Sequence, residues 1–119
     1  MKDLKDRTKQ FAIDIIHLCS SLPQKEEFRV IGRQLIRSAT SVGANYRSAR
    51  RAKSQRDFLA KLSIVEEEAD ESLYWLELLE GLGLRENEVL LKMKDEADQL
   101  VAIVVASKKT VRAKLKGTG

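Results

Sequence analysis

Apolar residues recur at alternating steps of three and four in four separate runs along the chain. This spacing places them on one face of an α-helix, because 3.6 residues complete each helical turn. Pro23 ends the first run, since proline disfavours helix in the preceding residue, and Gly81 ends the third. No alternation of apolar and polar residues is long enough to indicate a strand. The pattern predicts an all-α protein with helices at about residues 3–21, 25–53, 55–80 and 85–115.

Four helices of this length joined by short loops are typical of an antiparallel up-down-up-down four-helix bundle, with both termini at one end. A chain of 119 residues can bury one core without a metal or a disulfide, so we predict a single domain over residues 1–119. Aromatic residues make up only 5% of the sequence. We therefore expect a core built mainly of aliphatic side chains.

Two of the predicted helices carry more apolar surface than a bundle core needs. The third has a second apolar strip beside its main one, and the fourth is apolar all round between residues 100 and 106. Surplus apolar stripes usually mark contacts between subunits. We predict a homo-oligomer whose interface includes Ile64, Tyr74, Trp75 and Leu78. The alternative is a wide core stripe with a partly exposed Trp75.

Charge is strongly segregated between the second and third predicted helices. Residues 29–56 carry eight Lys or Arg and no acid, whereas residues 57–80 carry eight Asp or Glu and one base. Seven of the eight bases are arginines, whose planar guanidinium forms two parallel hydrogen bonds to a phosphate or a carboxylate. Helical projection places five of them on one face, away from the apolar seam: Arg29, Arg33, Arg37, Arg47 and Arg51.

This basic face has two interpretations. Part of it can pair with the acidic helix, and an antiparallel arrangement brings Arg37 and Arg47 near Glu68 and Glu71. The remainder can meet an external polyanion such as RNA or DNA. The candidate nucleic-acid-binding residues are Arg33, Arg47, Arg50, Arg51, Lys53 and Arg56. The C-terminal tail, which we expect to fray, adds a basic arm formed by Lys108, Lys109, Arg112, Lys114 and Lys116.

Residues 38–45 form a run of small side chains inside the basic helix. Gly43 lies within it and costs about 1 kcal/mol of helix propensity relative to alanine. A glycine retained at that cost indicates that something approaches the helix backbone closely. A neighbouring helix is the favoured partner, and a ligand is the alternative.

The sequence holds few of the residues that catalysis or metal binding needs. His17 is the only histidine and projects away from the apolar seam, and Cys19 is the only cysteine. Glu68 and Glu71 have the spacing of a di-iron ligand pair but lack the histidines such sites require. No glycine-rich phosphate loop is present. We predict no enzymatic activity, no metal, no cofactor and no small-molecule substrate.

The longest apolar run, Leu100–Ala106, is far too short to cross a membrane, and the chain start lacks an apolar signal core. A single cysteine fits a reducing compartment. We therefore expect a cytoplasmic protein without a membrane partner.

Two segments resemble one known family. Residues 37–54, followed by Asp57 and Phe58, and residues 68–76 are similar to bacterial four-helix-bundle proteins encoded in 23S rRNA intervening sequences. The resemblance implies a homopentameric ring of bundles. It also implies kinship with the accessory proteins of diversity-generating retroelements, which are basic pentameric bundles that bind nucleic acid and a reverse transcriptase. It supplies no established biochemical role and does not imply membership of the ribosome.

Two functions follow as hypotheses. In the first, an oligomeric bundle binds structured RNA or DNA through backbone contacts, because no recognition-helix motif or zinc-finger spacing indicates sequence-specific readout. In the second, the protein is a homo-oligomeric interaction scaffold, whose basic and acidic helices pair across subunits without any nucleic acid.

Overall fold

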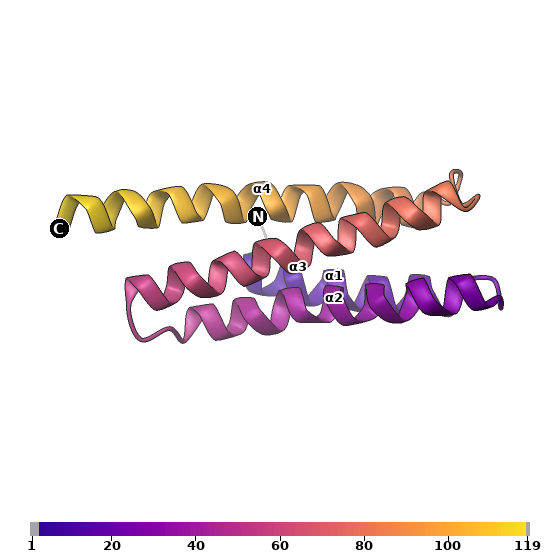
Figure 1. Cartoon of the computed structure of the whole chain (residues 1–119), viewed down its shortest axis with the longest axis horizontal. Helices are drawn as coiled ribbons and strands as arrows, with labels where there is room; N and C mark the ends of the chain where they lie inside the picture. Colours follow the sequence, from indigo (N-terminus) through magenta and orange to yellow (C-terminus); the bar gives the residue numbers. More distant parts are fainter. Residues whose placement is uncertain (1–2, 119) are drawn as a thin grey trace.

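The computed structural model describes residues 3–118, and the regular structure of that part of the chain is entirely helical. The four helices are α1 (Leu4–Ser20), α2 (Glu26–Arg50), α3 (Gln55–Gly81) and α4 (Glu88–Thr118). Each predicted helix is present (Figure 1). The largest differences are at three boundaries: α2 ends about three residues earlier than predicted, and α4 both begins and ends about three residues later.

Side-chain caps explain where three of the helices begin. The Asp3 carboxylate accepts a hydrogen bond from the backbone N–H of Asp6, and the Ser54 hydroxyl accepts one from the N–H of Asp57. Asn87 caps α4 in the same way, with its side-chain oxygen 2.9 Å from the backbone nitrogen of Leu90. Such caps satisfy backbone donors that the first helical turn leaves without partners. Because α4 begins after the Asn87 cap, residues 84–86 lie in a loop. The apolar pattern alone does not show this boundary.

The Asp57 carboxylate also joins α3 to the end of α2. It accepts a hydrogen bond from the backbone N–H of Lys53 and another from the Lys61 ammonium, both at 3.0 Å. Both hydrogen bonds lower the pKa of Asp57 below its ordinary value, and the bond from the backbone has the larger effect. They fix the short connection at which the chain reverses direction.

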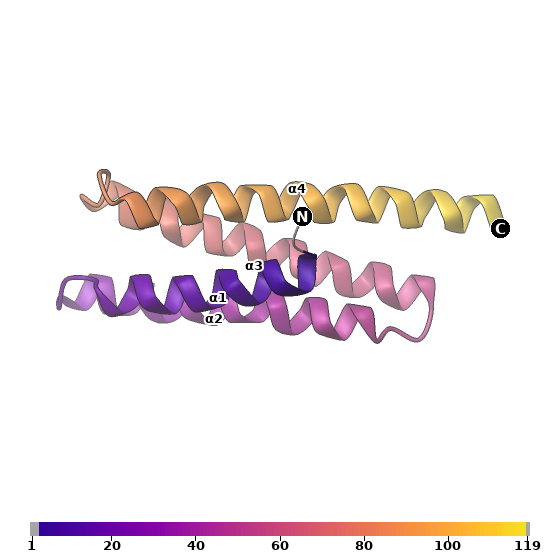
Figure 2. The same ribbon diagram turned by 180° about the vertical axis from the view of Figure 1, so that it is seen from behind.

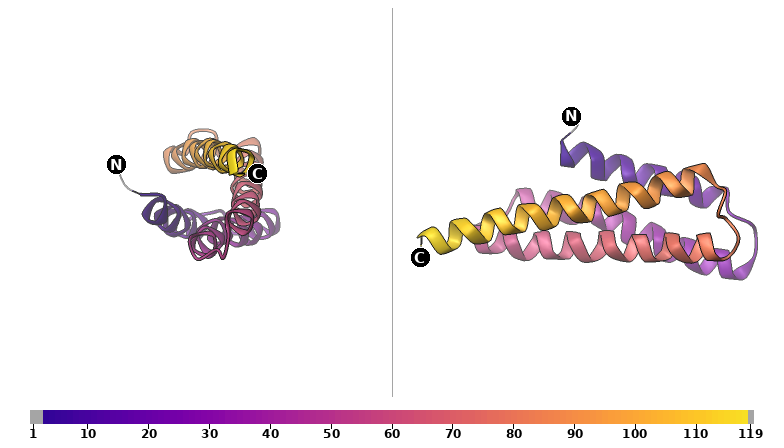
Figure 3. Two further views of the ribbon diagram at one scale, coloured as in Figure 1. Left: turned by 90° about the vertical axis from the view of Figure 1, so that its left-hand side faces the viewer. Right: turned by 90° about the horizontal axis from the view of Figure 1, so that it is seen from above.

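The helices pack in chain order as antiparallel neighbours, so α2 lies between α1 and α3, and α3 lies between α2 and α4 (Figures 1 and 2). This confirms the predicted up-down arrangement. The end-on view in Figure 3 shows the helix backbones as an arc with α1 and α4 at its two ends, and side chains of α1 and α4 meet between these ends, where Arg7 bonds to Glu96. Helix α1 has 17 residues and α4 has 31, so α1 begins near the middle of α4 and not at its C-terminal end. The expectation that both termini lie at one end is therefore wrong.

The core is mainly aliphatic, as predicted, and includes Phe11 of α1 and Phe28 of α2. The largest fully buried apolar side chains are Phe11, Ile15, Leu35, Leu62, Leu76, Leu79, Leu90 and Leu100. Two serines are buried between α2 and α3, where the Ser72 hydroxyl donates to Ser38 Oγ at 2.8 Å. Each hydroxyl thereby has a partner, which a buried polar group requires.

Gly43 lies where α1 packs against α2. A Cβ atom at this position would stand 3.4 Å from both the carbonyl oxygen and Oγ1 of Thr8. The Thr8 side chain is itself buried. The predicted close approach at Gly43 is confirmed, and the neighbour is α1.

The predicted interface strip lies on the outer side of α3. Ile64 and Tyr74 are exposed, whereas Trp75 and Leu78 are half-buried. The Tyr74 and Trp75 rings meet edge to face with centroids 5.2 Å apart. In α4, Leu100 and Val104 are buried in this chain and Ala102 and Ala106 are exposed. Val101, Ile103 and Val105 are half-buried, and Val89 and Leu91 are exposed nearer the start of α4. Both α3 and α4 therefore carry surplus apolar surface.

Candidate nucleic-acid interface

A groove of about 640 Å³ runs between the first half of α1 and the second half of α2. Five of its lining residues are cationic and none is acidic. The lining consists of Lys5, Thr8, Lys9, Ala12, Thr40, Gly43, Ala44, Tyr46, Arg47, Arg50 and Arg51. It therefore contains three of the six residues predicted to bind nucleic acid.

Helical spacing brings these side chains to one place. On α1, Lys5 and Lys9 are four residues apart and lie on the same side of the helix. At the end of α2, Arg47 and the C-cap residue Arg51 have the same spacing. The contact between Thr8 and Gly43 holds the two helices together between these cationic walls. The antiparallel arrangement then places the start of α1 beside the end of α2.

The five cations of the groove have no salt-bridge partner in the part of the chain that the structure describes. Within residues 3–118, none of Lys5, Lys9, Arg47, Arg50 and Arg51 forms a salt bridge, and all five are exposed. Clustered like charges in a concave surface concentrate the positive potential and attract anions. Arginine guanidiniums suit phosphate oxygens in particular, because they donate two parallel hydrogen bonds.

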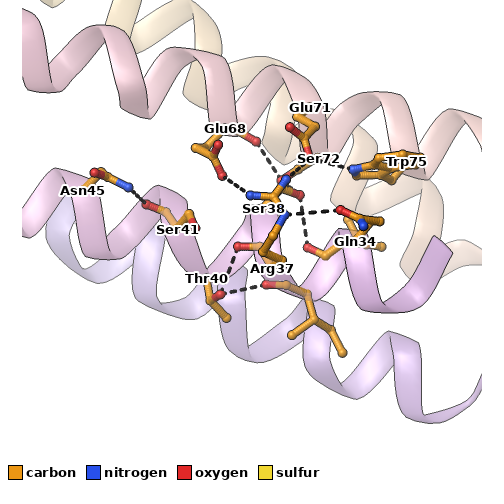
Figure 4. Close-up of polar contacts among 12 residues, drawn as sticks. Gln34, Arg37, Ser38, Thr40, Ser41, Asn45, Glu68, Glu71, Ser72 and Trp75 are labelled. Atoms are coloured by element: carbon orange, nitrogen blue, oxygen red, sulfur yellow. Dashed lines mark hydrogen bonds and ion pairs between the residues drawn. The ribbon is translucent and has the colours of Figure 1, made fainter. Parts of the chain in front are cut away.

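The middle of the basic helix has a different role. Arg37 donates to Glu68 across the seam at 3.1 Å and also forms an ion pair with Glu71 (Figure 4). The Trp75 indole N–H donates to the same Glu71 carboxylate at 3.0 Å. The predicted pairing with Glu68 and Glu71 is therefore confirmed for Arg37.

The same pairing is wrong for Arg47. This residue lies ten positions further along α2, about 15 Å at 1.5 Å per residue. Because the helices run antiparallel, the stretch of α3 at that level is residues 58–65, which contains no acid. Arg47 lines the groove beside α1 instead.

The other three predicted site residues lie outside the groove. Arg33 is on the first half of α2 and approaches Glu26, with Nη2 3.9 Å from Oε1. Lys53 and Arg56 are exposed at the turn from α2 to α3, beyond the end of the groove. The structure therefore keeps Arg47, Arg50 and Arg51 together and separates Arg33 from them.

Lys5 and Lys9 are the groove residues that sequence reasoning missed. The segment containing them is nearly neutral overall, so it gave no charge signal. Their spacing of four and their position beside Thr8, opposite Gly43, were the available clue. This clue can be used only when the part of α1 that packs against Gly43 is known. The sequence does not show how α1 is positioned along α2.

The predicted fraying of the C-terminal tail is wrong. The tail is helical, because α4 continues to Thr118. Lys108 forms an ion pair with Glu66 on α3 at 2.9 Å. Lys109, Arg112 and Lys116 are exposed on the same segment. Figure 1 shows that this segment extends past the α2–α3 turn, at the end of the bundle towards which the groove opens.

The opposite end of the bundle carries a mixture of acids and bases. The α1–α2 and α3–α4 connections lie there, with the neighbouring helix ends. Its exposed acids are Glu26, Glu27, Glu77, Glu86 and Glu88, and its exposed bases are Lys25, Arg29, Arg85 and Lys92. This end therefore lacks the excess of cations found at the groove end of the molecule, whose longest dimension is 53 Å.

The described residues offer little to catalysis. Among residues 3–118, no cluster of three or more His, Cys, Asp or Glu side chains could hold a metal ion. His17 is exposed, as predicted. Burial raises the pKa of the Cys19 thiol to about 11, which keeps it in the poorly nucleophilic protonated form. No helix in this part of the chain is long and apolar enough to span a membrane.

The fold and the groove define the class of this protein as a four-helix bundle with a basic surface groove. The family model described as 23S rRNA-intervening sequence protein matches residues 3–106, so the chain belongs to that family. This confirms the resemblance drawn from the two sequence segments.

A crystal structure from Bacteroides thetaiotaomicron VPI-5482, described as a protein with unknown function from the S23 ribosomal protein family, superposes with a TM-score of 0.82. That protein is 34% identical to this chain, and the match covers 90% of this chain and 99% of the other. No functionally curated protein matches the chain. The comparisons define the family and the fold and assign no activity.

Proposed function

We propose that this protein is a non-enzymatic binder of nucleic acid, which holds the phosphate backbone of RNA or DNA in the groove between α1 and α2. One observation carries the proposal: five cations line one groove that contains no acid, and none of them forms a salt bridge within residues 3–118. Placing like charges together costs energy unless a polyanion neutralises them. Arg37 on the same helix is the contrasting case, because two carboxylates of the protein neutralise its charge.

Backbone contacts, and not base contacts, are the expected mode of recognition. Beyond the cations, the polar groups of the groove are the hydroxyls of Thr8, Thr40 and Tyr46. Those of Thr8 and Thr40 already donate to carbonyl oxygens of their own helices. Sequence readout needs several donors and acceptors directed at base edges, which this lining lacks. We therefore expect little discrimination among sequences.

The salt dependence of the affinity tests this proposal. Each neutralised phosphate contributes about −0.9 to the slope of log K against log salt for duplex DNA and about −0.7 for single strands. Full use of five cations gives slopes of about −4.5 and −3.5. Fluorescence anisotropy with a labelled single-stranded RNA and a labelled DNA duplex, titrated at several salt concentrations, measures both slopes. Absence of binding at low salt, or a slope near zero, contradicts the proposal.

We also propose that the chain forms a homo-oligomer, for which the family resemblance suggests a pentameric ring. The supporting observation is the apolar strip on the outside of α3, where Ile64 and Tyr74 are exposed and Trp75 is half-buried. Arg37 and its carboxylate partners border this strip and can fix the register of a second copy (Figure 4). A polyanion bound to several copies would contact several grooves, and its affinity would rise accordingly.

Introducing a charge into the strip tests the assembly. The wild-type protein is expected to have a mass in solution that is a multiple of 13.5 kDa. Ile64→Arg is expected to reduce it towards the single-chain value, because a buried unpaired charge at an interface is costly. The matched control is Leu91→Arg on α4, since both side chains are 41% exposed. Light scattering after size-exclusion chromatography distinguishes these outcomes, and a monomeric wild type refutes the proposal.

A further inference from the structure

The two walls of the groove stand on helices that are held in place unequally. The α2 wall belongs to a helix packed between α1 and α3. The α1 wall is at the free start of the shortest helix, since Lys5 and Lys9 lie in its first two turns. The large apolar anchors of α1, including Phe11 and Ile15, come after this segment. Within the first two turns, Leu4 is partly buried against the core and Thr8 is buried, and a polar contact adds a further anchor.

This polar contact is a clasp between α1 and α4, formed by Arg7, Glu96 and Gln99. The Arg7 Nε atom donates to Glu96 Oε2 at 3.1 Å, and Nη2 donates to Glu96 Oε1 at 2.6 Å. Nη2 also donates to the Gln99 side-chain oxygen at 3.1 Å. The hydrogen bond to Glu96 raises the pKa of Arg7 above its ordinary value. Both charged side chains are largely covered, at 18% and 24% exposed, so solvent screens the pair less than an open surface pair.

The clasp acts on the turn of α1 that builds the groove. Arg7 lies between Lys5 and Lys9 in the sequence and faces α4, whereas the two lysines face the groove. Thr8, in the same turn, packs against Gly43 of α2. This turn is therefore held from one side by α4 and from the other by α2, and both lysines depend on it for their position.

We propose that the Arg7–Glu96 clasp is a positioning contact that presents Lys5 and Lys9 to a phosphate chain held by the α2 arginines. This inference rests on the proposed function of the groove. Without the clasp, the first turns of a helix fray readily, and ordering them again on binding costs affinity. Arg7 itself faces away from the phosphate chain, so it acts through the placement of the two lysines.

Glu96→Gln tests the coupling, because two physical effects predict changes of opposite sign. Removing an acid makes the protein more positive and by electrostatics alone strengthens binding to a polyanion. Loss of the clasp weakens binding, and we expect a loss of about 3- to 10-fold for a labelled RNA hairpin, corresponding to about 1 kcal/mol. The matched control is Glu86→Gln, which removes one exposed acid that has no salt bridge within residues 3–118. Its affinity is expected to be equal to or higher than that of the wild type.

Amide hydrogen exchange provides an independent measurement. Amides of residues 5–10 are expected to exchange faster in Glu96→Gln than in the wild type, and bound RNA is expected to slow them in the wild type. The charge-swapped double variant Arg7→Glu with Glu96→Arg can restore an ion pair at the same net charge. We expect it to regain most of the lost affinity and protection, and it serves as the test if Glu96→Gln alone lowers the helical content.

The outcomes separate this inference from the proposed function. If the wild type binds no nucleic acid at low salt, the proposed function fails and the inference fails with it. If the wild type binds and folded Glu96→Gln binds as tightly as Glu86→Gln, the inference is overturned while the proposed function stands. Failure of a folded charge-swapped variant to regain affinity also overturns the inference.

Discussion

Simultaneous substitution of Arg50 and Arg51 by glutamate is expected to weaken binding to RNA and DNA by at least about 100-fold at moderate salt. The double change replaces two of the five groove cations with anions that repel the phosphate chain. For duplex DNA, the slope of log K against log salt is expected to become shallower by about 1.8, or 0.9 for each lost phosphate contact. Anisotropy titrations with a labelled DNA duplex at several salt concentrations measure both quantities.

The matched control changes the same residue types on the same helix. Arg29→Glu with Arg33→Glu alters the net charge equally, but both arginines lie on the first half of α2, near Glu26. We expect this variant to lose only a few-fold in affinity. Equal losses in the two double variants would show that binding follows net charge and would contradict the assignment to the groove.

The same variants also address the scaffold hypothesis, in which basic and acidic helices pair across subunits. On that hypothesis the wild type binds no nucleic acid, and the change at Arg50 and Arg51 alters the mass of the assembly. The Arg37 ion pairs with Glu68 and Glu71 lie within one chain, so they already satisfy part of the charge complementarity that this hypothesis invokes. The nucleic-acid hypothesis uses the cations that remain without carboxylate partners.

Much of the fold was predictable because it depends on local patterns. The period of apolar residues marks four helices, Pro23 and Gly81 mark two of their ends, and the chain order of antiparallel neighbours follows from short loops. The glycine at position 43 correctly indicated a close helix contact. The partners of Arg37 also follow, because Glu68 and Glu71 lie at its level when α2 and α3 run antiparallel.

The groove was only partly predictable, because it depends on how one helix slides along another. The sequence places Arg47, Arg50 and Arg51 on an outward face, but it does not show that α1 covers one side of that face. A shift of α1 by one turn would bring different residues to Arg47. For that reason the sequence pattern favours α3 as the partner of Arg47 and does not indicate Lys5 and Lys9. Register between helices is set by side-chain packing over the whole bundle, which no single segment encodes.

Leu76→Ala is expected to have the largest effect on stability. Leu76 is fully buried in α3, the helix that packs against both α2 and α4. Removing a buried leucine side chain costs about 2–5 kcal/mol, because the lost apolar contacts add to the energy of the remaining cavity. A domain of this size has a free energy of unfolding of about 5–15 kcal/mol, so this loss is a large fraction of the total. We expect the thermal midpoint to fall by roughly 10–15 °C.

The control for this prediction is Leu82→Ala, the same substitution at a side chain that is 47% exposed. It should change the free energy of unfolding by no more than about 0.5 kcal/mol, as is usual for surface positions. Urea unfolding followed by circular dichroism compares the two variants. Because α3 contributes nothing to the groove lining, folded Leu76→Ala at low temperature is expected to keep the wild-type affinity for RNA. A loss of affinity in the folded variant would show that the groove depends on the α3 core and would contradict its assignment to α1 and α2 alone.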